Sequence, residues 1–421
     1  MPDFHRPVPP RRLDSIDALR GAAVLAVLSV HATGHYISTL EHTHPLLYAL
    51  LYPVRFGHVG VDLFLILSGF CIHLRLAAAT PAGQAMRLPF RSFWARRFRR
   101  LYPPYLVALV GSMALMIAIG MWQRNDYQLG SLAGQSATLG ADLATHVLMI
   151  HLFFAAFATG AGNGAFWSLA LEEHLYLLYS PLLWMRNRMG IAGMLAVVAC
   201  ICLVWRVVCV SLLGAAPAMP AGGVGLEPAP QLWMLQAPAR WFEWCLGAIA
   251  VEAYLGRVKL PRWCAVWPVG VALLGAGMWT THFSLGWWVN DLLWGCGFFV
   301  ILNTVVQRET AVRAAGSPRW NSRIVLTLAG LGVFSYSLYL IHVPLLRTVT
   351  LLGYNFGLQP GSTRLVLLLL VAAAACIPLA YLFHCLFERP FLTYRRQSAD
   401  QQPSSPSAVP TAAHVQVRRA A

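Results

Sequence analysis

Arg20 and His31 are the two residues of this chain whose types and spacing best suit chemistry. They flank the apolar run Gly21–Val30, and eleven steps of helix make about three turns, so both side chains lie on one stripe about 16 Å apart. A histidine at mid-membrane depth is costly, and function is its default interpretation. A neutral core histidine bonded to a helix carbonyl is the alternative. A metal pair with His35 has no nearby acid to support it.

A second group of basic residues, Arg96–Arg100, directly precedes Tyr102 at the start of another apolar run. The guanidinium fork suits phosphate because it donates two parallel hydrogen bonds. We therefore expect this cluster, together with Arg20, to hold a cytoplasmic, nucleotide-bearing donor whose long arm reaches His31. The alternative is an anchor that only contacts anionic membrane lipid.

Two adjacent acids, Glu172 and Glu173, enter a further apolar run, which is expensive unless they are paired or line a wet cavity. Glu172 shares a helix face with Tyr176 and is our second catalytic candidate, although a purely structural ion pair remains open. Arg240 and Glu243 are expected to satisfy each other, and Arg206 has no assigned role. The polar residues expected to line the substrate site are Asp62, Trp167, Ser168, Glu173, Tyr176, Tyr336 and His342.

Composition indicates that the positioning elements are membrane helices. Hydrophobic residues make up 58% of the 421 residues, charged residues 11%, and mean hydropathy is +0.59, whereas soluble domains carry about 25% charged residues. The formal net charge is +15, but the basic residues stand in short clusters between apolar runs, which is typical of membrane topology rather than of nucleic-acid binding. The nine cysteines form no CxxC pair, and we expect buried small side chains and no metal site.

A helix needs about 20 apolar residues to cross a bilayer. The runs long enough are 21–38, 58–79, 101–122, 166–185, 191–213, 237–255, 263–281, 288–306, 325–347 and 364–387. The sequence therefore predicts an all-α membrane protein with about ten transmembrane helices. A shorter stretch, 143–159, contains His146 and His151 and is expected to be interfacial or re-entrant.

The basic residues orient these helices. If the N-terminus is cytoplasmic, 25 of the 31 Lys and Arg residues lie on the cytoplasmic side, and the exceptions are Arg55, Arg124, Arg206, Arg240, Arg347 and Arg364. Both termini are then cytoplasmic. We expect residues 1–20 to form a cytoplasmic segment, 21–392 the membrane domain and 393–421 a disordered cytoplasmic tail.

The chain resembles the integral-membrane acyltransferase family 3, the O-antigen and exopolysaccharide O-acetyltransferase-like proteins, over about residues 11–395. The matching motifs stand in the family's order: Leu13–Gly21 with His31, Gly60–Phe64 with Ser68–Phe70, Arg97–Pro103, Trp167–Tyr176, Tyr336–His342 and Glu388–Phe391. The family's Arg-x10-His pattern falls on Arg20 and His31, and its Arg-x-x-Arg pattern on Arg97 and Arg100. His174 departs from the family, which often has glutamine there.

The resemblance implies a ten-helix, multi-pass protein of the bacterial inner membrane that takes an acyl group, usually acetyl, from cytoplasmic acyl-CoA. It further implies that Arg20, Arg97, Arg100 and Tyr102 bind this donor and that the acceptor is a hydroxyl, typically on a sugar of a lipid-linked or exported glycan. Direct transfer without an extracytoplasmic esterase-like domain is the expectation. An alcohol is a poor nucleophile until a base accepts its proton, so we expect His31 to act as general base or, alternatively, as a transiently acylated nucleophile.

Two other functional classes stay open. A transporter or flippase would use buried His, Arg and Glu as a proton or substrate path, and a non-catalytic scaffold would not need the Arg20 and His31 register. Within the acyltransferase interpretation, the acceptor can be an exopolysaccharide, lipopolysaccharide, lipo-oligosaccharide signal or small glycosylated metabolite. Acyl-chain length, direct or ping-pong transfer and oligomeric state are also open.

Overall fold

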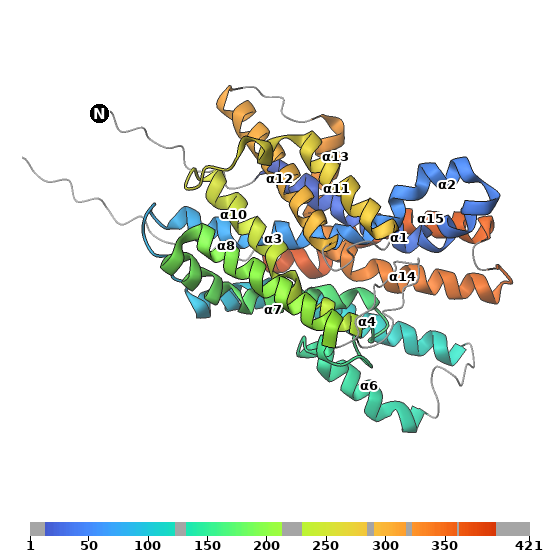
Figure 1. Ribbon diagram of the computed structural model, residues 1–421. Coiled ribbons are helices and arrows are strands. Elements are labelled where there is room, and N and C mark those ends of the chain that lie inside the picture. The colour runs from blue at the N-terminus through green and yellow to red at the C-terminus, as the bar shows by residue number, and fades with distance from the viewer. Residues whose placement is uncertain are drawn as a thin grey trace, which may run out of the picture.

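The structure is a computed structural model of the chain, and it describes residues 13–122, 132–212, 230–283, 290–316, 322–359 and 362–392. Within these ranges every regular element is helical, which confirms the all-α fold (Figure 1). The expected disordered tail and most of the expected N-terminal segment lie outside the described residues.

The helices follow one another along the chain with short 3-10 turns (η) between them. In chain order they are α1 (Asp14–Thr43), α2 (Pro45–Leu51), η1 (Tyr52–Val59), α3 (Gly60–Ala79), α4 (Phe90–Trp122), α6 (Leu132–Val147), η2 (His151–Phe153), η3 (Gly164–Phe166), α7 (Trp167–Leu177), α8 (Tyr179–Leu212), α9 (Pro230–Met234), α10 (Ala237–Tyr254), η4 (Arg262–Ala265), α11 (Trp267–His282), α12 (Asn290–Ala314), α13 (Arg323–Val333), α14 (Ser335–Asn355), α15 (Thr363–Phe383) and the single π-helical turn η6 (His384–Glu388).

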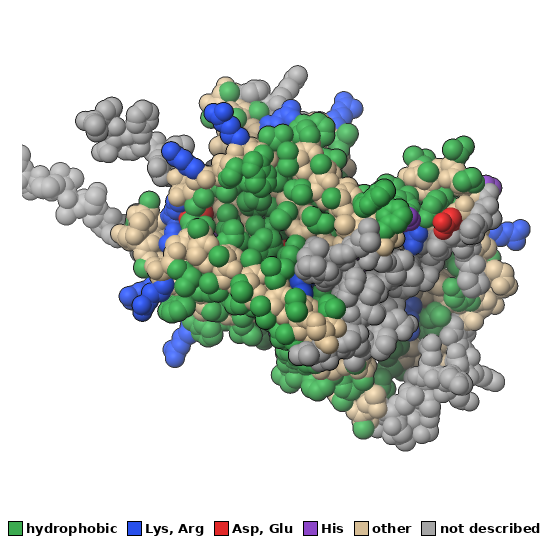
Figure 2. All heavy atoms as spheres, viewed as in Figure 1, with side chains coloured by type: hydrophobic (Ala, Val, Ile, Leu, Met, Phe, Trp, Pro, Cys, Tyr) green, Lys and Arg blue, Asp and Glu red, His purple; other side chains and the backbone are tan. Residues whose placement is uncertain are grey.

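Five helices of the described chain are long and apolar enough to cross a membrane, or six if the bent pair α13 and α14 forms one span. One of the five covers two predicted runs, 166–185 and 191–213, which Gly190 separates with a backbone φ of 71°. That left-handed conformation favours glycine. The predicted runs 237–255, 263–281 and 288–306 coincide with α10, α11 and α12. Hydrophobic side chains cover much of the face shown in Figure 2, and Lys and Arg gather toward its edges.

The predicted single helix over 325–347 is wrong. The chain bends by 73° between α13 and α14, where Phe334 leaves the helical conformation at φ −114° and ψ 20°. Gly330 and Gly332, which are weak helix formers, precede the bend, and the Ser335 hydroxyl donates to the Gly332 carbonyl at 3.0 Å. The hydroxyl thereby adds a hydrogen bond to one of the last carbonyl groups of α13.

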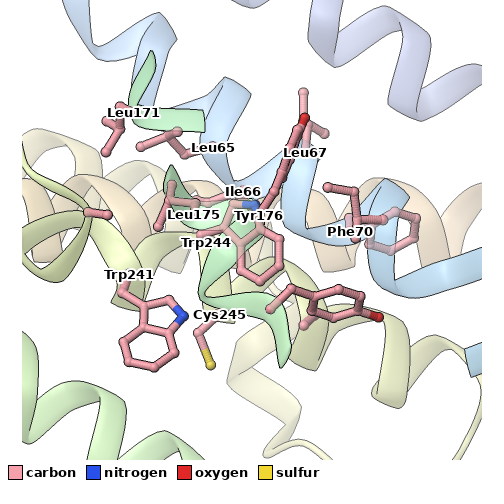
Figure 3. Packing of buried hydrophobic residues seen from close by; sticks show 14 of the residues in the cluster. Leu65, Ile66, Leu67, Phe70, Leu171, Leu175, Tyr176, Trp241, Trp244 and Cys245 are labelled. Atoms are coloured by element: carbon pink, nitrogen blue, oxygen red, sulfur yellow. The ribbon is translucent and has the colours of Figure 1, made fainter. Parts of the chain in front are cut away.

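The core forms where α3, α7 and α10 meet (Figure 3). Leu67, Phe70, Leu175 and Trp244 are almost completely buried there. Helices α3 and α10 cross backbone to backbone, because a Cβ added at Gly69 would lie 2.0 Å from the Trp244 carbonyl oxygen. Small residues permit this close approach between membrane helices.

The expected Arg240–Glu243 pair is replaced by a five-residue ion cluster. Arg240 binds Asp62 of α3 and also Asp291 of α12, the latter at 2.5 Å. Glu243 instead binds Arg206 of α8 at 3.4 Å, and Arg206 reaches Asp291 at 3.1 Å. The two α10 side chains meet charges on different neighbouring helices, which a spacing of three residues could not reveal. Arg206 therefore has a structural role that the sequence left unassigned.

Candidate active site

A cavity of about 380 Å³ lies where α1, α3, α4, α7 and α14 meet, close to η6. Its lining contains most of the residues that the sequence singled out. Three arginines and three carboxylates surround it: Arg20, Arg97, Arg100, Asp17, Glu172 and Glu388. Ser168, Tyr176 and Tyr336 also line it, so residues that lie far apart in the sequence meet in one site.

Two of the three guanidinium groups have no carboxylate partner in the part of the chain that the structure describes. Arg20 donates to Asp17 at 3.4 Å and to the Cys71 sulfur at 3.2 Å. Arg97 instead lies over the Tyr176 ring, 5.2 Å from its centroid, and the Nε atom of Arg100 is buried without a hydrogen-bond partner. Within the described ranges, no carboxylate lies within 4.0 Å of Arg97 or Arg100.

The other two carboxylates of this cavity, Glu172 and Glu388, accept hydrogen bonds from hydroxyl and imidazole groups. Glu172 accepts from Ser68 Oγ at 2.6 Å and from the Tyr176 hydroxyl. Glu388 accepts from Ser337 Oγ at 2.6 Å and from His384 Nδ1 at 2.8 Å. Both carboxylates thus have hydrogen-bond donors other than the arginines, and the Arg97 and Arg100 guanidinium groups can bind an anion.

His31 lies farther along α1, and one of its hydrogen bonds defines its tautomer. Its Nδ1 is 2.8 Å from the Val27 carbonyl oxygen, which can only accept, so Nδ1 carries the proton and Nε2 carries the lone pair. The ring edge meets His342 at a centroid distance of 5.0 Å. His342 is 1% exposed; its Nδ1 donates to the Tyr339 carbonyl at 2.8 Å and its Nε2 has no hydrogen-bond partner among the described residues.

His31 does not itself line the arginine cavity. Tyr339 and Ser168, whose hydroxyls lie 2.5 Å apart, line the cavity. Tyr339 also contacts His342 at a centroid distance of 5.5 Å. The cavity and the histidine pair are therefore neighbours, with this hydroxyl pair between them.

The structure places four other predicted site residues outside the cavity. Tyr102 and Glu173 line a second, apolar cavity of about 560 Å³ on the other side of α4 and α7. Asp62 is buried in the ion cluster, and Trp167 is half-buried against the core. Tyr336 lines the arginine cavity and donates to the Leu101 carbonyl at 2.8 Å.

Glu388 and Asp17 are cavity residues that our assignment of candidates missed. Glu388 is 2% exposed and lies in η6, a π-helical turn, and such turns are frequent at functional sites. The rule that selected Glu172, an acid in or next to an apolar run, also applies to Glu388, which directly follows the run 364–387. The rings of His146 and His151 stack on each other at a centroid distance of 3.8 Å, and neither residue lines this cavity. In the described residues, no group of three or more His, Cys, Asp or Glu side chains is arranged to hold a metal ion.

Comparison with known proteins identifies a family and several relatives. A family described as an acyltransferase domain matches residues 13–385. The peptidoglycan O-acetyltransferase OatA of Listeria monocytogenes is 28% identical over 180 residues, which is 41% of this chain and 25% of that protein. The putative peptidoglycan O-acetyltransferase YrhL of Bacillus subtilis is 26% identical over 178 residues, 42% of this chain and 24% of that protein.

The acyltransferase MdmB of Streptomyces mycarofaciens is 27% identical over 256 residues, 58% of each chain. The chain thus spans about a quarter of the two peptidoglycan O-acetyltransferases and just over half of MdmB. No solved structure matches the chain.

Proposed function

Because the chain belongs to the integral-membrane acyltransferase family, whose domain covers residues 13–385, it is an acyltransferase, and we propose that it transfers acetyl from cytoplasmic acetyl-CoA to a glycan hydroxyl. The names of OatA and YrhL favour a cell-wall or exported glycan as the acceptor. MdmB, which is named only as an acyltransferase, leaves a smaller acceptor open.

The observation that carries the donor assignment is the pair of guanidinium groups at Arg97 and Arg100. They border a cavity within the membrane domain without a carboxylate partner in the described chain, although an unpaired charge there is expensive. A ligand with several phosphates compensates both charges through bidentate hydrogen bonds. Coenzyme A is such a ligand, and Arg20, at the same cavity, is the third cation available to it.

The proposed reaction needs one base. The acceptor hydroxyl attacks the thioester carbonyl while Nε2 of His31 accepts the hydroxyl proton. The tetrahedral intermediate expels the thiolate of coenzyme A, which takes the proton back from the imidazolium. The products are the acetyl ester and the thiol. Glu172 orients the site through Ser68 and Tyr176, and the thioester arm must pass the Ser168–Tyr339 hydroxyl pair to reach His31.

We further propose the membrane arrangement that the charge distribution favours. The domain over 21–392 crosses the bacterial inner membrane about ten times, and both termini, 1–20 and 393–421, are cytoplasmic. This orientation puts Arg20, Arg97 and Arg100 on the cytoplasmic side, where acetyl-CoA is available, and His31 nearer the outer face. The 25 basic residues assigned to the cytoplasm support it.

Replacement of both Arg97 and Arg100 by Gln tests the donor site. We expect the KM for acetyl-CoA to rise at least tenfold, because each lost charge-assisted hydrogen bond contributes about 1.5–3 kcal/mol. The rate of coenzyme A release by the purified full-length protein in detergent, with chitotetraose as acceptor, gives the KM. Arg99→Gln is the matched control, since Arg99 is exposed and does not line the cavity.

An unchanged acetyl-CoA KM in the double variant contradicts the donor site. Detergent also removes any transmembrane gradient. A wild-type protein that binds acetyl-CoA but never transfers acetyl in detergent therefore favours the transporter interpretation over the enzyme.

A further inference from the structure

Asp291, in the first turn of α12, is a carboxylate that binds the arginines of the ion cluster through one of its two oxygens. Its Oδ2 atom forms ion pairs with Arg206 Nη2 at 3.1 Å and with Arg240 Nη1 at 2.5 Å. Its side chain nevertheless remains 29% exposed, and in the described residues no partner is found for the second oxygen. A carboxylate has about four acceptor positions. Two guanidinium groups therefore fix this side chain while one oxygen stays available to a ligand.

His58 is an exposed imidazole in η1, just before α3. The glycines on either side of it bring this turn onto α1: a Cβ added at Gly57 would lie 2.2 Å from the Ala26 carbonyl oxygen, and one at Gly60 would lie 2.5 Å from that of Ala23. The contact places His58 beside the α1 segment that leads to His31. Phe56 of the same turn contacts both the His58 ring, at a centroid distance of 6.4 Å, and Trp294 of α12, at 5.9 Å, so the turn that carries His58 packs on α12 one helical turn after Asp291.

Neither side chain can face hydrocarbon. An exposed carboxylate within a membrane domain is tolerated only where water or a polar ligand reaches it, and Asp291, in the first turn of α12, is also favoured by the helix dipole. Asn290, the preceding residue, is 8% exposed, and its buried Oδ1 atom has no hydrogen-bond partner among the described residues. The geometry therefore indicates a polar site that contains acceptors and an imidazole.

We propose that His58 and Asp291 form the subsite that binds the hydroxyl groups of the acceptor sugar. The assignment rests on the proposed function. A sugar hydroxyl donates to the available oxygen of Asp291 and also hydrogen-bonds with the His58 ring. The carboxylate repels the phosphates of the donor, which the unpaired Arg97 and Arg100 attract. The two substrates are thereby sorted by charge, with the neutral polyol next to His31 and the polyanion at the arginine cavity.

Two variants, His58→Gln and Asp291→Asn, test the subsite in the purified full-length protein. Chitotetraose is the probe, and its affinity is measured directly by calorimetry in the absence of any donor. We expect each variant to weaken chitotetraose binding about tenfold, the loss of one hydrogen bond to a charged or polar partner. Binding of coenzyme A by the same preparations is expected to stay unchanged.

The controls separate folding, subsite and function. His44→Gln replaces another exposed histidine, which lies between α1 and α2, and is expected to bind chitotetraose like the wild type. Asp291→Asn can weaken the ion cluster, so its melting temperature is recorded, whereas His58 makes no ion pair in the described chain. Undiminished sugar binding by His58→Gln, or no binding by the wild type, overturns the subsite. Sugar binding that depends on His58 without any acetyl transfer upholds the subsite and refutes the proposed function.

Discussion

At the residue scale, one hydrogen bond decides how His31 can act. The Val27 carbonyl fixes the proton on Nδ1, so Nε2 is the basic nitrogen in the proposed reaction. His342 has the same arrangement, with its Nδ1 on the Tyr339 carbonyl. Both rings are thus held by the backbone turn that precedes them, which orients two imidazoles without using a carboxylate.

Replacement of His31 by Gln tests the base. Gln keeps a hydrogen-bonding side chain of similar size but cannot take up a proton, so we expect kcat to fall about 10²–10⁴-fold. The KM for acetyl-CoA should change less than about threefold, because the arginines that bind the donor are untouched. Initial rates at saturating acetyl-CoA check both values, and a variant that keeps more than half of the wild-type kcat contradicts the assignment.

At the element scale, the site depends on close helix crossings and on one bend. The Gly69 and Gly247 backbones bring α3 against α10, since a Cβ on either would lie about 2 Å from a facing carbonyl oxygen. The 73° bend before α14 turns Tyr336 and Tyr339 toward the arginine cavity, where both side chains line the wall. Ser168 of α7 reaches the same wall.

Gly69→Ala tests the crossing. The added methyl group would clash with the Trp244 carbonyl, and separation of the two helices should destabilise the protein by about 1–3 kcal/mol. The matched control is Gly111→Ala in α4, where nothing lies within 4 Å of an added Cβ; it should be neutral or stabilise by up to about 1 kcal/mol. Thermal denaturation in detergent compares the two. Equal melting temperatures of the Gly69→Ala and Gly111→Ala variants would contradict the close contact between α3 and α10.

At the scale of the whole molecule, the membrane domain contains two charge systems of different character. The ion cluster joins α3, α8, α10 and α12 through Asp62, Arg206, Arg240, Glu243 and Asp291. Removal of one partner from a buried ion pair typically costs about 3–5 kcal/mol, so the cluster holds these helices together. The arginine cavity differs, because two of its cations have no carboxylate partner in the described chain. We therefore assign a structural role to the ion cluster and a ligand-binding role to the cavity.

The proposed orientation gives a prediction for the intact cell. Single cysteines introduced at residues 5 and 410 in a cysteine-depleted background should resist a membrane-impermeant maleimide in intact spheroplasts and react after lysis. We expect this result because segments rich in Lys and Arg stay on the cytoplasmic side of the membrane, and both termini carry such residues. Labelling of either position before lysis would reverse the topology and place the arginine cavity on the outer side, away from acetyl-CoA. A cysteine introduced in place of Arg124 supplies the opposite control.

The sequence by itself determined the fold class, the family and the residues that carry charge into the membrane. The energetics of a bilayer require apolar runs and basic clusters. Each residue contributes to these patterns through its own side chain, so the sequence alone is enough to recognise them. The run over 325–347 shows where that approach fails, because its length predicts one helix and says nothing of the bend at Phe334.

Only the tertiary structure decided which charges are paired. Arg240 and Glu243 stand three residues apart but bind different helices, whereas Arg97 and Arg100 lie opposite Glu172 and Glu388 at one cavity without an ion pair to either. The cost of a buried charge depends on what stands within about 4 Å of it, and those neighbours come from distant parts of the chain. The local sequence determines that a charged side chain is present. The packing of the helices determines whether an opposite charge neutralises it or whether it stays available to a ligand.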